Sequence, residues 1–252
     1  MNKLYLIAAL LMGFTSIQGQ ITQMIVHETG GNTVTFQIAN VDSVTYYTTA
    51  IATCPSTITD SRDNEVYAVV QIGNQCWMAE NLRYDVPGVF GASDTVNAAN
   101  PSTTYGRHYN WATVMNGATT SSSNPSGTQG ICPSGWHLPS DAEWNELEMA
   151  LGMPAADTAT FGWRGTDHGT KMKSTTGWNN SGNGTNATGF NALPAGLYAA
   201  NKFHNLGGDA YFWAATENYS FAWNRFLYSG NTDVYRNSYE KSHGLSCRCL
   251  KD

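Results

Sequence analysis

The stretch that decides the fold is Cys132-Pro133-Ser134-Gly135-Trp136-His137-Leu138-Pro139-Ser140-Asp141-Ala142-Glu143-Trp144. Ser140 lies three residues before Glu143, which is the spacing of a capping box, where a hydroxyl and a carboxylate satisfy free amides at a helix N-terminus. An apolar stripe then follows at helical spacing, formed by Trp144, Leu147 and Leu151. Because Gly152 can adopt the left-handed conformation that ends a helix, the pattern predicts a short amphipathic helix over residues 141–151.

Residues 1–19 have the layout of a secretory signal peptide. Lys3 precedes an apolar run over residues 4–14, and small residues follow up to Gly19. The apolar run is too short to span a bilayer, and no later run of eighteen apolar residues occurs. We therefore expect an exported protein, secreted or on the bacterial surface, without a membrane span.

The composition favours an extracellular, loop-rich β protein. Charged residues make up 13% of the chain and aromatic residues 12%, whereas the charged share is usually about 25%. The net charge is −6 and no basic cluster occurs. Nucleic acid binding, which depends on neutralising phosphates with Lys and Arg, is therefore not expected.

Five cysteines, namely Cys54, Cys76, Cys132, Cys247 and Cys249, point to disulfides if the chain is exported. Spacing alone cannot determine their connectivity. We favour Cys132 with Cys249, which would contribute roughly 4 to 5 kcal/mol in the chain-entropy model, and Cys54 with Cys76. In an extended strand Cys247 and Cys249 point to the same face, so either could pair with Cys132.

The distribution of apolar residues predicts an α+β fold. A small β-hairpin extension is expected within residues 20–50, with a hairpin and a third short strand between residues 24 and 46. A larger domain over residues 54–252 follows, with a β-meander, long polar loops, one helix, and aromatic strands after residue 190. We expect residues 244–250 to form the final strand.

Several separated segments resemble the Fibrobacter succinogenes major paralogous domain, a family of exported bacterial modules. They cover nearly everything from Cys54 to the end and include Ile72-Gly73-Asn74-Gln75-Cys76-Trp77-Met78-Ala79-Glu80-Asn81-Leu82, Cys132 to Trp144, Gly189-Phe190-Asn191-Ala192-Leu193-Pro194-Ala195-Gly196, Tyr211-Phe212-Trp213-Ala214-Ala215-Thr216-Glu217 and Arg248-Cys249-Leu250-Lys251-Asp252. The chain departs from the family pattern at Cys247, where an aliphatic residue is usual.

The segment from His137 to Trp144 is also similar to the formylglycine-generating, sulfatase-modifying enzymes. This resemblance implies a C-type lectin-like fold with long loops. Those enzymes use a pair of reactive cysteines upstream of their last strand, and this chain has no such pair there. An oxidoreductase that uses Cys247 and Cys249 is therefore the alternative, while buried structural thiols are the interpretation we favour.

The sequence does not indicate a metal, a cofactor or a catalytic residue. The six histidines show no close pair at metal-ligand spacing, and no Gly-x-Ser-x-Gly motif occurs. Residues 60–65 lack the register and the central glycine of a calcium loop. In Trp223-Asn224-Arg225, where calcium-dependent lectins have an acidic residue third, the arginine would repel a cation.

The sequence favours a non-catalytic surface binding or adhesion module. Aromatic residues beside amides suit a glycan or protein ligand, and the candidate ligand-binding residues are Trp178, Asn179, Asn180, Trp223 and Asn224. Four other tryptophans are assigned to packing, namely Trp77, Trp136, Trp144 and Trp213. A further alternative is a structural surface subunit whose strands in residues 24–46 dock onto the sheet edge of another chain.

Overall fold

A computed structural model describes residues 23–27, 33–37, 54–87, 89–90 and 102–252. The chain divides into two compact units, Met1–Ala52 and Thr53–Asp252. In the first unit, β1 (Gln23–His27) pairs antiparallel with β2 (Thr33–Gln37), as the alternation of β-branched residues predicts. The predicted signal peptide and the predicted third short strand lie outside the described residues.

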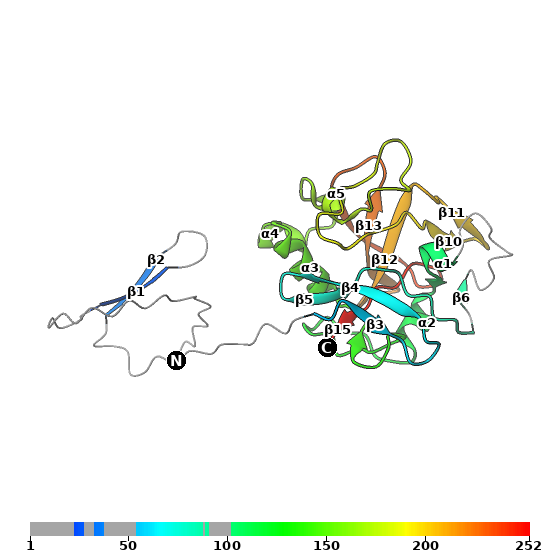
Figure 1. Ribbon diagram of the computed structural model, residues 1–252, viewed down its shortest axis with the longest axis horizontal. Helices are drawn as coiled ribbons and strands as arrows, with labels where there is room; N and C mark the ends of the chain where they lie inside the picture. Colours follow the sequence, from blue (N-terminus) through cyan, green and yellow to red (C-terminus); the bar gives the residue numbers. More distant parts are fainter. Residues whose placement is uncertain (1–22, 28–32, 38–53, 88, 91–101) are drawn as a thin grey trace. The chain divides into compact units, whose positions relative to one another are not determined.

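The second unit combines many short strands with a few short helices (Figure 1). Its strands are β3 (Thr57–Thr59), β4 (Val66–Ile72), β5 (Gln75–Met78), β6 (Val89–Phe90), β7 (His108–Tyr109), β8 (Trp136–His137), β9 (Gly162–Arg164), β10 (Leu197–Ala199), β11 (Lys202–His204), β12 (Asp209–Asn218), β13 (Phe221–Tyr228), β14 (Val234–Glu240) and β15 (Leu250–Lys251). Its helices are α1 (Ser102–Tyr105), α2 (Trp111–Met115), α3 (Asp141–Ala150), α4 (Ala155–Thr158) and α5 (His168–Met172). The α+β content agrees with the sequence prediction.

Two sheets organise the second unit. One has the strand order β3-β4-β5-β15-β8 and the other β12-β13-β14-β9. The last strand, β15, lies between β5 and β8, with Leu250 opposite both Trp77 and His137. The C-terminal end of the chain thereby closes a sheet that begins near Cys54 (Figure 1).

The predicted final strand over residues 244–250 is wrong in extent. Only Leu250–Lys251 forms a strand, because the preceding residues pair one by one with different segments. Gly244 bridges to Tyr198, Leu245 to Tyr109, and Ser246 to Phe212. Helices α1, α2, α4 and α5 were not predicted, since four or five residues are too few to show a helical period.

Helix α3 begins where its capping box requires. The Ser140 hydroxyl accepts from the Glu143 amide, and the Glu143 carboxylate accepts from the Ser140 amide at 2.9 Å. The helix ends at Ala150 with Leu151 as its C-cap, one residue short of the predicted end, and Gly152 has a φ of 103°. These local signals place α3 correctly because they act within one turn of the chain.

Aromatic side chains fill the core on both sides of the β12-β13-β14-β9 sheet. Trp77 and Trp144 lie with ring centroids 4.6 Å apart and pack with Phe190 and Phe212. Trp213 and Trp136 belong to a second cluster that contains the cysteines near the C-terminus. All four tryptophans that the sequence assigned to packing are buried.

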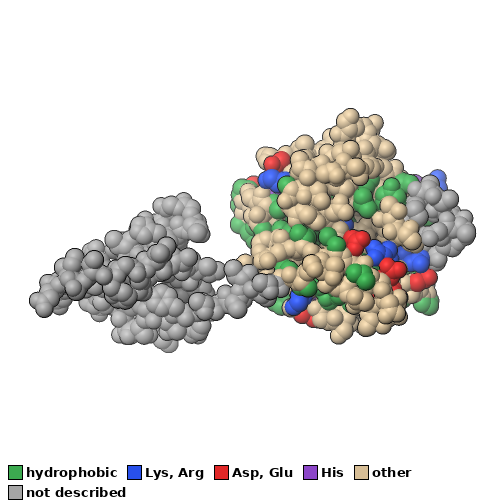
Figure 2. All heavy atoms as spheres, in the orientation of Figure 1, with side chains coloured by type: hydrophobic (Ala, Val, Ile, Leu, Met, Phe, Trp, Pro, Cys, Tyr) green, Lys and Arg blue, Asp and Glu red, His purple; other side chains and the backbone are tan. Residues whose placement is uncertain are grey.

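Among the residues that the structure describes, no helix combines the length and the apolar character needed to cross a bilayer. On the face drawn in Figure 2, charged side chains form small groups in which Lys or Arg lies near Asp or Glu. This sparse pattern agrees with the low charged fraction of the sequence.

Candidate functional site: a cavity beside a buried cysteine cluster

The structure joins Cys54 to Cys76 and Cys132 to Cys249, which is the pairing favoured from the sequence. The Cα atoms are 5.5 and 5.9 Å apart, within the usual range for disulfides. Cys247 is a free and buried thiol. The second bridge spans 117 positions and ties the segment that leads into β8 to the C-terminal segment.

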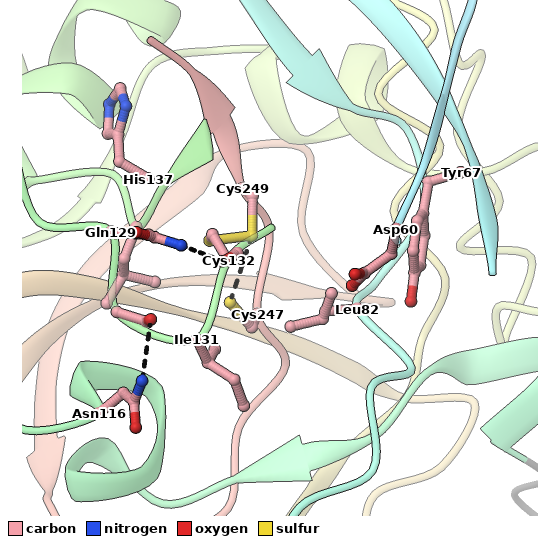
Figure 3. The surroundings of a disulfide bond; sticks show 12 residues. Asp60, Tyr67, Leu82, Asn116, Gln129, Ile131, Cys132, His137, Cys247 and Cys249 are labelled. Carbon is pink, nitrogen blue, oxygen red and sulfur yellow. Dashed lines mark hydrogen bonds between the residues drawn. A yellow bond between two sulfur atoms is a disulfide. The ribbon is translucent and has the colours of Figure 1, made fainter. Parts of the chain in front are cut away.

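Cys247 lies against the second disulfide (Figure 3). Its Sγ is 4.0 Å from Sγ of Cys249, and the sulfur atoms of Cys132, Cys247 and Cys249 all lie within 4.8 Å of one another. We call these three residues the cysteine cluster. Cys247 and Cys249 share a face of the segment, as the extended pattern predicts.

Arg248 points away from the cysteine cluster. Its guanidinium donates to Oδ1 of Asn81 and to the backbone carbonyls of Met78, Phe190 and Asn191, and it lies 4.4 Å from the ring centroid of Phe190. The side chain is buried, and burial lowers its pKa to about 9. The guanidinium of Arg248, the residue next to Cys247 in sequence, therefore joins backbone segments by hydrogen bonds.

The Cys247 thiol is poorly suited to nucleophilic chemistry. Burial raises its pKa to about 12, although Arg62 and Arg248 act in the opposite direction. Since the thiolate is the reactive form, a thiol with this pKa is almost entirely protonated at neutral pH. The Cys247 thiol is therefore expected to react slowly in the folded protein at neutral pH.

An open cavity of about 910 Å³ lies beside the cysteine cluster. It is lined by residues from four regions of the chain, namely Arg62, Tyr84, Val86, Pro87, Ala112, Thr113, Asn116, Gly117, Ala118, Gln129, Gly130 and Ile131. Among these described lining residues, Arg62 carries the one charged side chain. We call this site the Arg62 cavity.

Arg62 is held in place by a buried carboxylate. Its Nε and Nη2 donate to the two oxygens of Asp60 at 2.8 and 2.6 Å, and its Nη1 donates to the carbonyl of Ile131 at 2.9 Å. Burial acts to raise the pKa of Asp60, but the hydrogen bonds from Arg62 outweigh it and lower that pKa. The guanidinium also lies 3.8 Å from the ring centroid of Tyr84, so the two side chains form one continuous part of the lining.

Another part of the lining presents amides and backbone groups. Asn116 ends α2 in the left-handed region, with φ 47° and ψ 43°, and its Nδ2 lies 3.4 Å from the carbonyl of Gly130. Gln129 donates to the carbonyl of Cys132 at 3.2 Å. Because residues 129–131 directly precede Cys132, the disulfide to Cys249 fastens this part of the lining (Figure 3).

The ligand-binding residues predicted from the sequence do not lie at this cavity. Trp178 is 5% exposed, and its indole donates to the carbonyl of Ala192 and to Ser174 Oγ. The expectation that Trp178 is an exposed platform is therefore wrong, because the residue fills the core under its own loop. Asn179 and Asn180 beside it are exposed.

The second predicted pair is also placed differently. Asn224 is fully buried, and its amide has no hydrogen-bond partner among the described residues. It therefore cannot contact a ligand in this conformation. Trp223 is half-buried, and the guanidinium of Arg236 lies 3.4 Å from its ring centroid.

Phe161 and Trp163 are exposed aromatic residues that were not predicted as such from the sequence. Phe161 is 56% exposed and Trp163 is 37% exposed, and both rings pack edge-on against Tyr235, at 5.9 and 4.9 Å. The signal is the alternation Phe161-Gly162-Trp163, which is typical of a short strand with one face in solvent. The Arg62 cavity could not be predicted from the sequence, because its walls come from segments that are far apart in the chain.

Comparison with known proteins gives one result. A family model described as the Fibrobacter succinogenes major domain matches residues 70–251. No curated protein and no solved structure matched the chain. The matched region includes all of β5, α3 and the late strands, and it ends at the second residue of β15. Because this region is well over half of the chain, the protein belongs to the Fibrobacter succinogenes major domain family.

Proposed function

We propose that this protein is an exported, non-catalytic module for surface binding or adhesion, and that it binds a glycan or a protein segment in the Arg62 cavity. The observation that supports this proposal is the lining of the cavity. The lining combines the Arg62–Tyr84 pair with amides and backbone groups, and no Cys, His, Asp or Glu occurs among the described lining residues. Such a surface suits binding, and among the described lining residues it offers no carboxylate, imidazole or thiolate for catalysis.

The chemistry of the lining suits ligands with both apolar faces and hydroxyl or amide edges. Tyr84, Val86 and Pro87 supply apolar contact, while Asn116, Gln129 and Thr113 supply hydrogen-bonding groups. Asp60 and the Ile131 carbonyl already orient Arg62, so little side-chain entropy would be lost on binding. A short glycan or an extended peptide has the matching chemistry.

The setting of the module is part of the same proposal. The two disulfides are compatible with an oxidising, extracellular compartment, and residues 1–19 supply an export signal by their pattern. We also propose a C-type lectin-like fold, for which the mixed helix and strand content and the C-terminal closing strand give support.

A sulfatase-modifying-like oxidoreductase is the alternative. The buried Cys247 and its pKa of about 12 weigh against it. Thiol titration of the folded, non-reduced protein separates the two proposals. A binding module should show no fast-reacting thiol and one thiol after unfolding, whereas an enzyme using Cys247 and Cys249 should show reactive thiols or bound copper. The structural subunit remains a third candidate, tested by deleting residues 24–46 and measuring assembly.

The binding proposal is tested by blocking the cavity. Ala118 lines it and is exposed, so Ala118→Trp should fill it without disturbing the core. Ala156 in α4 is also exposed and lies outside the lining, so Ala156→Trp is the matched control. The purified protein is screened on a glycan array and a peptide array.

We expect Ala118→Trp to reduce binding of the array hits at least tenfold and Ala156→Trp to leave it unchanged. Hits that bind both variants equally would contradict a binding role for this cavity.

A further inference from the structure

The cysteine cluster contains one thiol more than its disulfide uses, and the proposed binding function gives that thiol no role. Cys132, Cys247 and Cys249 are all fully buried, and their sulfur atoms lie within 4.8 Å of one another. Two cysteine sulfurs, those of Cys247 and Cys249, therefore lie close to the sulfur of Cys132, and Cys249 forms the bridge. Cys247 is therefore a candidate to replace Cys249 as the disulfide partner of Cys132.

Backbone hydrogen bonds fix the segment that carries both sulfurs, in addition to the disulfide. The amide of Leu82 donates to the carbonyl of Cys247 at 3.0 Å, and the amide of Met78 donates to the carbonyl of Cys249 at 3.0 Å. Arg248 between them is anchored on the opposite side by Asn81. Because the segment is extended and fixed at both residues, Cys247 and Cys249 present their sulfurs to the same side.

We propose that Cys247 is a built-in exchange partner, so that Cys132 can form its bridge with either Cys247 or Cys249 inside the folded core. In the exchange, the Cys247 thiol loses its proton and its sulfur attacks Sγ of Cys132. The bond between Cys132 and Cys249 breaks as the bond between Cys132 and Cys247 forms. Cys249 leaves as a thiolate and takes up a proton, so the number of disulfides is unchanged and no outside oxidant is needed.

The exchange allows a chain that has formed the Cys132–Cys247 bridge to convert it to the Cys132–Cys249 bridge. A chain that first joins Cys132 to Cys247 still brings the C-terminal segment beside β5 and β8, and Cys249 can then displace Cys247 in place. Burial raises the pKa of Cys247, so exchange in the finished fold should be slow at neutral pH and should accelerate as the pH rises. Before the core closes, the same thiols are more exposed and exchange faster.

The test uses the full chain, produced under oxidising conditions, with Cys249→Ser. Peptide mapping without reduction should find a Cys132–Cys247 bridge beside Cys54–Cys76. Cys247→Ser is the matched control and should keep Cys132–Cys249. Far-UV circular dichroism and tryptophan fluorescence establish that each variant is folded. A folded Cys249→Ser protein in which Cys132 and Cys247 are both free thiols, or in which Cys132 is joined to Cys54 or Cys76, would overturn the proposal.

A second measurement covers the case in which Cys249→Ser does not fold. The unaltered protein is reduced, unfolded and allowed to reoxidise, and samples are quenched with acid and mapped over time. We expect a species with Cys132–Cys247 that converts to Cys132–Cys249 at a rate independent of protein concentration. If that species never appears, or if Cys247 instead joins Cys249, the proposal is wrong.

Discussion

Nε of Arg225 donates to Oε1 of Glu148 across 2.7 Å, although both side chains are fully buried. The pair connects β13 to α3, and two further arginines extend it, since Arg164 binds Glu148 and Arg236 binds Asp141. Arg225 also donates to Asp141 at 2.6 Å. The arginine that the sequence analysis considered only as a group that repels cations is thus the centre of a buried ion network that fixes α3 on the sheet.

Removing one partner from this network should be strongly destabilising. Glu148→Gln leaves the guanidinium groups of Arg225 and Arg164 without their shared carboxylate in a site closed to water, which should lower the free energy of unfolding by about 3 to 5 kcal/mol. Urea unfolding followed by tryptophan fluorescence measures this loss. Glu146→Gln is the control, because Glu146 lies on the same helix with an exposed hydrogen bond to Asn124, and it should cost less than about 1 kcal/mol. Equal losses for the two variants would show that the network adds no stability.

His137 should make stability fall as the pH rises above about 6.5. Its Nε2 lies 2.8 Å from Glu143 Oε1 and its Nδ1 lies 2.7 Å from Asp252 Oδ1. Burial acts to lower the pKa of His137, but Glu143 and Asp252 outweigh it and raise that pKa above the usual 6.5. The stabilisation is therefore fully present below about pH 6.5 and is lost as the pH rises through the raised pKa.

The melting temperature, measured from pH 5 to 9, checks this expectation for His137. His137→Gln should flatten the decline above pH 6.5, and an unchanged profile in the variant would contradict it.

His108 should act in the opposite direction. It is buried, and burial lowers its pKa to about 4, because its site favours the neutral ring. The folded state therefore keeps its full advantage above about pH 6.5, and stability is lost as the pH falls from that value toward 4. NMR titration of the histidine Cε1 protons should show one ring that stays neutral down to about pH 4, and that resonance should be absent in His108→Asn. A His108 resonance that titrates near pH 6.5 would show that the ring is reached by water.

The Cys247 thiol should not react with thiol reagents in the folded protein. With a pKa raised to about 12 by burial, it should not react with 5,5′-dithiobis(2-nitrobenzoate) within an hour at pH 7.5, and one thiol per chain should react after unfolding in guanidinium chloride. Cys247→Ala should abolish that signal. Rapid reaction in the native protein would favour the oxidoreductase alternative.

Trp178 should prove structural and Trp163 dispensable for folding. Trp178→Ala removes a buried indole and its hydrogen bonds to Ser174 and Ala192, so it should lower the free energy of unfolding by about 3 to 5 kcal/mol. Trp163→Ala removes a side chain at a sheet edge with 37% of its surface exposed, and it should cost clearly less. Denaturant unfolding of both variants provides the comparison, and a smaller loss for Trp178→Ala would contradict its place in the core.

Features that depend on neighbouring residues could be predicted from the sequence. The Ser140–Glu143 capping box acts within one helical turn, so the start of α3 is correct. The turn at Gly73 and Asn74 joins β4 to β5, which agrees with the predicted β-meander. The cysteine pairing was favoured but left open between Cys247 and Cys249, because both residues project from the same side of one extended segment and the chain alone does not rank them.

The sequence by itself determined the capped helix, the main strands and an α+β domain closed by its last segment, because helix caps, turns and alternation are short-range properties. Which polar and aromatic side chains are exposed to solvent was decided only by the tertiary structure. It buried Trp178, Asn224 and Arg225, and it brought Arg62, Tyr84 and Asn116 together around one cavity. The physical reason is that burial and cavity walls arise from packing between segments far apart in the chain, whose relative positions no local pattern encodes.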